Sequence, residues 1–182
     1  MSESPLPAGG ILVDITTSLG AFQIAVFADQ APITARNFLS YLDGGYLAEG
    51  SVYRIATPQN EAHKPVHIDV LQFGWKWLEG GRGAPIPPIP LESTQVTGLR
   101  HVQGTVSTAR FEVDNGGYGF FICMRDEPEL DFGGRRHPDG QGFAAFGRVV
   151  SGWEVIEAIR ARAEDQDMLS QPIALLSAAR QD

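Results

Sequence analysis

Two neighbouring segments near the start of the chain constrain the fold more than any other feature of the sequence. Every second residue is apolar over residues 11–15 and again over residues 22–26, and the short stretch Ser18-Leu19-Gly20 separates them. Alternation with a period of two is typical of strands that bury one face, and a tight turn between two such runs favours an antiparallel pair. Residues 10–27 are therefore predicted to form a β-hairpin.

Short strands dominate the rest of the chain. Apolar and β-branched runs bounded by Gly, Pro, Asn or Asp predict strands at residues 51–56, 67–73, 104–110, 119–125, 143–150 and 172–180. With the hairpin this makes about eight strands, joined mostly by short turns. The predicted fold class is mainly β: a closed eight-stranded antiparallel β-barrel capped by two α-helices.

Two segments carry helical spacing instead. Apolar residues recur every three or four positions over residues 31–43, where Pro32 suits a first helical turn and Gly44-Gly45 a helix end. The second helix is predicted at residues 151–162. Ser151 would cap it, with Glu154 three positions on, which is the spacing of a capping box.

Length and composition fit one domain. The chain has 182 residues, of which 43% are hydrophobic and 20% charged, enough for a sizeable core. Residues 1–9 are predicted to be a flexible lead-in and residues 10–182 a single domain, since no internal repeat or linker interrupts them. The proline-rich segment 84–92 is expected to be an extended surface loop, because proline cannot pair within a central strand.

The charge balance restricts the partners. A formal net charge of −8 argues against nucleic acid and anionic membranes, which attract surfaces rich in Lys and Arg. No apolar stretch approaches the ~20 residues that span a bilayer, and the N-terminus lacks the pattern of a signal peptide. The sole cysteine, Cys123, cannot form an internal disulfide. Because no signal peptide is seen, we expect a cytoplasmic protein. Nothing in the sequence demands a dimer, so we expect a monomer.

Several kinds of active site find little support. The chain has no Gly-x-Ser-x-Gly motif of a serine hydrolase and no Gly-rich phosphate loop before a helix. His63 and His67 are four residues apart with Asp69 nearby, which would fit a metal site in a cupin-type barrel. Pro65 lies between them and would break the helix that such a pair needs, so a solvated loop is the better interpretation.

The order of several motifs points to a known family. PITARNF on the first helix is followed by Tyr53-Arg54, then Gln72, and then by GTVSTAR, GFFIC, PELDF and FAAFGRV. This succession over residues 10–180 resembles the cyclophilin family of peptidyl-prolyl cis-trans isomerases, and the stretch that begins with PELDF is similar to its bacterial branch. The resemblance implies an eight-stranded antiparallel barrel capped by two helices. It also implies isomerisation of X-Pro bonds in unfolded or partly folded proteins, assisting their folding, without metal or cofactor.

The resemblance assigns roles to individual residues. Arg54 matches the family's catalytic arginine, and Gln72 matches the glutamine that supports it and positions the substrate backbone. Phe121 and Leu130 match the wall and floor of the proline pocket, which Val70 also lines. The further substrate-binding residues that the resemblance implies are Tyr53, Ala109, Arg110 and Phe143.

An arginine is suited to this chemistry. Rotation about an X-Pro bond has a barrier of roughly 20 kcal/mol, because the proline nitrogen shares its lone pair with the carbonyl. In the twisted state the lone pair is free to accept a hydrogen bond, and a fixed donor to it favours the transition state. One preorganised donor is worth ~3–4 kcal/mol, or about 10²–10³ in rate. Arg54 is therefore predicted to face a cleft.

Some positions depart from the family pattern. Glu129 stands where an aromatic residue is typical, Gly119 replaces Gln or Glu, and Asp69 replaces a pocket phenylalanine. The apolar rim of the pocket is thinner as a result. The alternative hypothesis is a proline-peptide binding module of the same fold with weak or no turnover.

Overall fold

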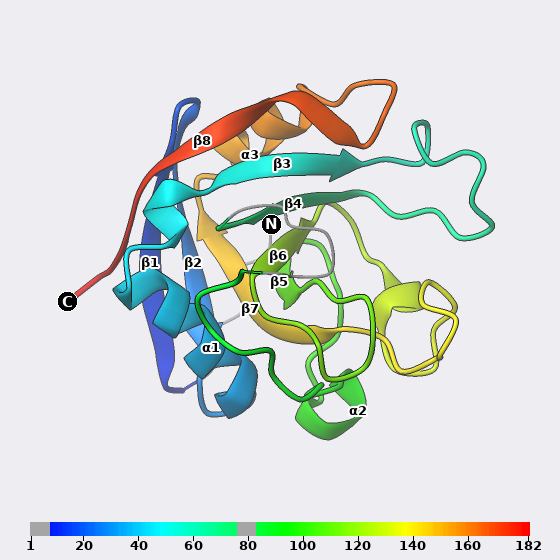
Figure 1. The fold of residues 1–182 in the computed structure, drawn as a ribbon, viewed down its shortest axis with the longest axis horizontal. Helices are drawn as coiled ribbons and strands as arrows, with labels where there is room; N and C mark the ends of the chain where they lie inside the picture. Colours follow the sequence, from blue (N-terminus) through cyan, green and yellow to red (C-terminus); the bar gives the residue numbers. More distant parts are fainter. Residues whose placement is uncertain (1–7, 76–82) are drawn as a thin grey trace.

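A closed barrel of eight strands forms the body of the protein. The computed structural model describes residues 8–75 and 83–182. Within them the strands follow the order β1-β2-β7-β5-β6-β4-β3-β8, and each neighbouring pair is antiparallel (Figure 1). The strands are β1 Gly10–Thr17, β2 Gly20–Phe27, β3 Ser51–Ala56, β4 Val70–Gly74, β5 Thr105–Thr108, β6 Gly119–Cys123, β7 Ala144–Ser151 and β8 Met168–Arg180. The predicted fold class is confirmed.

The first two strands pair along their whole length, as the alternation predicted. Gly10 lies opposite Phe27 and Thr17 opposite Gly20, so the register runs without a slip from end to end. Val13 on β1 is fully buried, which fits a strand with one face in the core. The predicted lead-in over residues 1–9 lies outside the described residues, except for residues 8 and 9, which form a turn.

Alternation along β6 separates the barrel interior from a second apolar cluster. Phe120 and Ile122 lie in the main core, where the Phe120 ring makes an edge contact with Phe38 at a centroid distance of 4.9 Å. Phe121 and Cys123 belong to the second cluster. Neighbouring side chains of a strand point to opposite faces of the sheet, so one short strand supplies both.

Two helices pack on the barrel. Helix α1 (Pro32–Asp43) contacts β2, β7 and β8, and helix α3 (Trp153–Arg160) contacts β2 (Figure 1). Pro32 begins α1 and Gly44 ends it, as predicted. Among the described helices, none has the length and apolar character needed to cross a membrane. Within residues 8–75 and 83–182, the shorter helical turns, which the sequence did not predict, are η1 Leu47–Glu49, α2 Thr94–Thr97 and η3 Pro128–Leu130.

The start of α3 differs from the prediction. Ser151 is the last residue of β7, and Gly152 takes the N-cap position with φ at 79°. The predicted cap at Ser151 is therefore wrong. A Cβ at position 152 would lie 2.6 Å from the Ala21 carbonyl oxygen, so the tight turn from strand to helix requires glycine.

A residue from the proline-rich segment caps α1 from a distance. Glu92 accepts hydrogen bonds from the backbone N–H groups of Ile33 and Thr34, at 3.2 and 3.0 Å, and from the Thr34 hydroxyl at 2.8 Å. These N–H groups belong to the first helical turn, where intrahelical acceptors are lacking and negative charge is favourable. The segment 84–92 is a loop without helix or strand, as expected, but Glu92 is buried and ties the end of the segment to α1.

Candidate active site

Part of the second apolar cluster forms the floor of a cavity on the barrel wall. The buried members of the cluster are Ala56, Ile68, Val70, Phe121, Cys123 and Leu130, and all but Ala56 and Cys123 line the cavity. The cavity has a volume of about 430 Å³, within the usual range for a small-ligand pocket. The structure brings all the predicted site residues together along this cavity: Tyr53, Arg54, Val70, Gln72, Ala109, Arg110, Phe121, Leu130 and Phe143.

A β-bulge directs Arg54 to the cavity. The register of β3 shifts between Val52 and Arg54 in its pairing with both β4 and β8, and Arg54 then lies opposite Gln72. Bulges bend a strand and redirect side chains, often beside active sites. The Arg54 side chain is 16% exposed. It donates from Nε to Asp167 at 2.8 Å, from Nη1 to Gln72 at 2.9 Å and from Nη2 to Glu61 at 2.8 Å.

The Gln72 amide is oriented by its two neighbours. Its Nε2 donates to the Tyr53 hydroxyl at 3.0 Å, so its Oε1 faces Arg54. Burial raises the pKa of Tyr53 well above its usual value, which keeps the hydroxyl protonated. A Cβ at Gly119 would lie 2.7 Å from that hydroxyl. The tyrosine therefore fills the space of a side chain at position 119, which accounts for a glycine where the resemblance implies Gln or Glu.

Phe121 packs against two other rings. It makes an edge contact with Phe143 at a centroid distance of 5.7 Å and stacks on His101 at 5.9 Å. His101 is buried, with Nδ1 2.8 Å from the Asp131 carboxylate and Nε2 2.8 Å from the Ser107 hydroxyl. Burial lowers the pKa of His101, against the opposing effect of Asp131. The ring behind Phe121 is therefore held by polar groups on both nitrogens.

The row Asp131-His101-Ser107 has the order of contacts found in a serine hydrolase triad. Ser107 is fully buried, so its hydroxyl cannot reach a substrate, and the row serves instead to hold the His101 ring against Phe121. No pattern in the sequence indicates this role of His101. Its partners lie 6 and 30 residues away, and no spacing rule links such positions.

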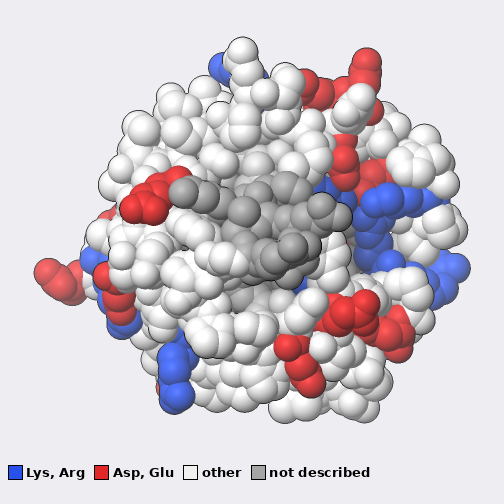
Figure 2. All heavy atoms as spheres, in the orientation of Figure 1, with Lys and Arg blue, Asp and Glu red and all other residues white. Residues whose placement is uncertain are grey.

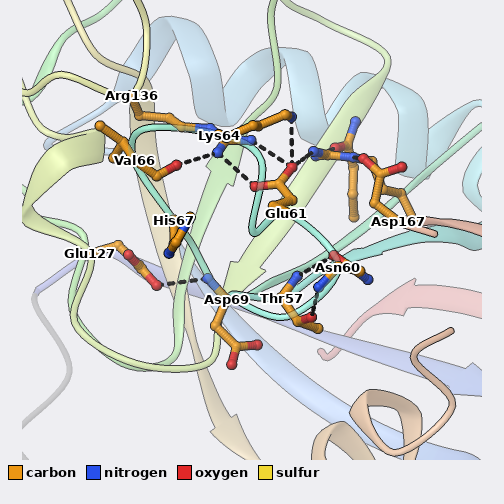
Figure 3. A network of polar contacts seen from close by, with 12 residues as sticks. Thr57, Asn60, Glu61, Lys64, Val66, His67, Asp69, Glu127, Arg136 and Asp167 are labelled. Atoms are coloured by element: carbon orange, nitrogen blue, oxygen red, sulfur yellow. Dashed lines mark hydrogen bonds and ion pairs between the residues drawn. The ribbon is translucent and has the colours of Figure 1, made fainter. Parts of the chain in front are cut away.

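Glu61 is the principal site residue that the sequence analysis missed. It lies in the turn after β3, is almost fully buried, and contacts Arg54 at 2.8 Å. Lys64 and Arg136 also contact it (Figure 3). Burial alone would raise the pKa of Glu61, but hydrogen bonds from Arg136 and Lys64 and the charge of Arg54 lower it to about 2. The sequence does place Glu61 only 7 positions after Arg54. No pattern in it indicates that the Glu61 side chain turns back toward the arginine.

Four Lys and Arg side chains from the described part of the chain line the cavity. In the orientation of Figure 2, the largest group of Lys and Arg atoms lies toward the right-hand side, with Asp and Glu atoms beside it. Arg54, Lys64, Arg110 and Arg136 all line the cavity, together with Asp167. The site is thus locally basic on a protein whose net charge is −8.

Arg110 stabilises the wall that carries Phe143. Its Nη atoms bind both Asp139 oxygens at 2.9 Å, and its Nε donates to the Gly142 carbonyl at 2.8 Å. The guanidinium carbon also lies 5.2 Å from the centre of the Phe143 ring. The Ala109 N–H donates to the Gly119 carbonyl at 2.9 Å, which joins this segment to β6.

Two of the unusual positions lie away from the cavity. Within the described residues, the cavity lining includes neither Glu129 nor Asp69. The Glu129 carboxylate binds Arg135 at 2.9 Å, and Asp69 binds Arg160 of α3 at 2.6 and 3.0 Å. Asp69 therefore contributes no side chain to the cavity and pairs with α3 instead.

The histidine pair considered as a metal site does not form one in the structure. Across residues 8–75 and 83–182, no three side chains of His, Cys, Asp or Glu converge as metal ligands.

Comparisons with known proteins agree with the order of motifs and with the fold. The family model described as "Cyclophilin type peptidyl-prolyl cis-trans isomerase/CLD" matches residues 12–180. The chain belongs to this family. Its relatives include peptidyl-prolyl cis-trans isomerase A of Dickeya dadantii, 32% identical over 90% of this chain and 81% of that protein. Peptidyl-prolyl cis-trans isomerase cyp18 of Streptomyces antibioticus is 28% identical over 91% of this chain and 96% of that protein.

Solved structures show the same fold. A cyclophilin-type peptidyl-prolyl cis-trans isomerase from Cryptosporidium parvum superposes with a TM-score of 0.73, at 17% identity, over 95% of this chain and 98% of that one. The same protein in the presence of the dipeptide Ala-Pro gives a TM-score of 0.71. The family model and the named relatives thus confirm the peptidyl-prolyl isomerase activity that the resemblance implied.

Proposed function

We propose that this cyclophilin isomerises X-Pro bonds in unfolded or partly folded proteins, with Arg54 as the catalytic residue and Gln72 beside it. The observation that carries the proposal is the position of Arg54. It lies at the junction between an apolar floor and a polar cluster, next to Gln72, in a cavity of about 430 Å³.

The floor would bind the proline ring. Phe121, Leu130 and Val70 are buried and apolar, and they offer a proline side chain a dry surface beside the arginine. A ring held there leaves the preceding carbonyl free to rotate, while the proline nitrogen meets an N–H of Arg54. In a site with little water, a fixed donor of this kind stabilises the twisted state more than either planar state.

Gln72 would bind the flanking backbone. Its amide nitrogen has a second N–H besides the one that it gives to Tyr53, and that donor can meet a substrate carbonyl. The Ala-Pro dipeptide named with the Cryptosporidium parvum cyclophilin supports a substrate of this kind. We further propose that the protein acts as a monomer in the cytoplasm, as its sequence led us to expect.

Arg54→Ala tests the catalytic assignment. Loss of one preorganised donor is expected to lower kcat/KM on a short X-Pro peptide by about 10²–10³. Far-UV circular dichroism would check that the barrel is intact. Full activity in Arg54→Ala would contradict the proposal. Peptide binding by the wild type without turnover would instead identify a binding module.

A further inference from the structure

A buried carboxylate beside the cavity holds three basic side chains together. Glu61 is 1% exposed, and its two oxygens lie between 2.6 and 2.8 Å from nitrogens of Arg54, Lys64 and Arg136. Figure 3 shows the Lys64 and Arg136 side chains meeting at Glu61, with Asp167 close by. A buried charge is costly unless it is paired, and Glu61 is paired several times over.

The turn that carries Glu61 is fixed by its own hydrogen bonds. Thr57 and Asn60 each accept a backbone N–H bond from the other through their side chains, at 2.9 and 3.0 Å. Asn60 also donates to the Ile55 carbonyl at 2.9 Å, and the Glu61 N–H donates to the Thr57 carbonyl at 3.0 Å. In Figure 3, Thr57 and Asn60 face each other beside Glu61. The carboxylate therefore projects from a preorganised turn.

Three acceptors hold the Arg54 guanidinium. Asp167 accepts a hydrogen bond from Nε. Gln72 accepts one from Nη1, and Glu61 accepts one from Nη2. A guanidinium has five N–H donors, so within the described part of the chain one donor remains on each Nη atom. A group anchored at all three nitrogens cannot rotate its plane without breaking a charged hydrogen bond. The two remaining donors are thus held in fixed directions.

The contacts do not neutralise the positive charge at the site. Glu61 and Asp167 contribute two negative charges, and Lys64 and Arg136 add two positive charges to that of Arg54. The cluster keeps a net charge of +1. Two carboxylates beside Arg54 alone would weaken its attraction for a lone pair, and the two further cations offset that loss.

We propose that Glu61 is a positioning residue for the isomerase reaction: it orients the Arg54 guanidinium toward the proline nitrogen, and Asp167 gives a second, weaker support. The inference rests on the proposed catalytic role of Arg54. Glu61 acts through Arg54 and does not touch the substrate. Its loss should therefore lower kcat more than it raises KM, because the apolar floor that binds the proline ring is unchanged.

Glu61→Gln is the primary test, measured alone and in combination with Arg54→Ala. Glu61→Gln should lower kcat by roughly tenfold or more, since small misplacements of a catalytic group can cost up to ~10²-fold. In the Arg54→Ala background the same change should have no further effect on kcat. Asp69→Asn is the matched control: it removes a carboxylate from another arginine pair outside the cavity, and kcat should stay within about twofold of wild type, as for a site away from the chemistry.

Asp167→Asn provides a second variant that is expected to fold, since Asp167 is 32% exposed. Its kcat should fall by about two- to fivefold, less than for Glu61→Gln, because a partly exposed pair contributes less. Nitrogen NMR of the Arg54 side chain adds a direct measurement. Rotation about the Cζ–Nη bonds should be slow in wild type and faster in each of these two variants, and unchanged in Asp69→Asn.

The outcomes separate this inference from the proposed function. If Arg54→Ala keeps full activity, both fall. If Arg54→Ala is impaired while folded Glu61→Gln and Asp167→Asn retain wild-type kcat, only the positioning role is overturned. An equal loss of kcat from Glu61→Gln in the presence and absence of Arg54 would also overturn it, because that loss would not pass through the arginine.

Discussion

The two faces of β6 show how differently the barrel interior and the cavity wall are built. Phe120 lies in the apolar core, where it contacts the rings of Phe38, Tyr41, Phe73 and Phe146. Phe121, the next residue, points to the cavity and stacks on His101, a polar ring fixed by hydrogen bonds.

The difference reflects what each face has to do. An interior ring is held by close packing, which has no direction and needs no polar partner. A ring at the edge of a cavity has atoms on one side only, so its neighbours must be held by directed bonds. Arg54 is held in the same way as the cavity wall, by directed hydrogen bonds to Gln72, Glu61 and Asp167, whereas the core is held by packing.

The largest expected contrast comes from truncating the two rings. Phe120→Ala should lower the free energy of unfolding by about 3–5 kcal/mol, because it leaves a closed cavity in the core. Phe121→Ala should lower the free energy of unfolding by about 2 kcal/mol, close to the free energy of transferring the side chain out of water. The space left by the ring would join the existing cavity instead of forming a new closed one. Urea unfolding measures both. Equal losses would show that the cavity wall is packed like the core.

In the same pair of variants, activity should follow the opposite order. Phe121→Ala should lower kcat/KM by about tenfold or more, since it removes the surface that orients the proline ring. Phe120→Ala should retain most activity at a temperature where it is folded.

A second effect concerns the pH dependence of stability. The pKa of His101 is lowered in the folded protein, chiefly by burial, from its ordinary value near 6.5. Below about pH 6.5 the unfolded state takes up a proton that the native state does not. The free energy of unfolding should therefore fall as the pH is lowered through this range, by up to ~1.4 kcal/mol per pH unit from this group.

His101 is faced by the Asp131 carboxylate and the Ser107 hydroxyl, and burial outweighs both in this prediction. Urea unfolding at several values between about pH 5 and 8, a range around the ordinary histidine pKa of ~6.5, measures how the free energy of unfolding changes with pH. His101→Gln should flatten it, whereas His63→Gln, on the exposed turn after β3, should not. A slope that survives His101→Gln would assign the proton to another group.

The smallest expected effect sharpens the comparison at the polar edge of the cavity. Tyr53→Phe removes the acceptor that orients Gln72, and it should lower kcat/KM by several-fold, equivalent to about 1 kcal/mol for one hydrogen bond. Gly119→Ala should destabilise the wild type, because its Cβ would lie 2.7 Å from the Tyr53 hydroxyl. The same change should be tolerated better in Tyr53→Phe. Equal costs of Gly119→Ala in the two backgrounds would contradict this steric account.

Much of the fold and of the site could be predicted from the sequence. Alternation over residues 10–27 predicted the hairpin, and Pro32 and Gly44 bracketed the first helix, because these signals depend on neighbours a few positions away. The order of motifs predicted the site residues, and all of the predicted residues line the cavity. Local patterns failed at Ser151, where the strand continued through the predicted cap.

Only the tertiary structure decided which distant groups meet. Glu92 caps a helix that begins 60 positions earlier, and Glu61 and Asp167 close on Arg54 from two separate loops. The periodicity of a strand or helix determines which face a residue occupies, but the position of a loop follows from how the whole barrel closes. The sequence by itself therefore determined the strands, the barrel and an arginine facing a cleft. The orientation of that arginine depends on charges brought together by folding, for which no spacing rule exists.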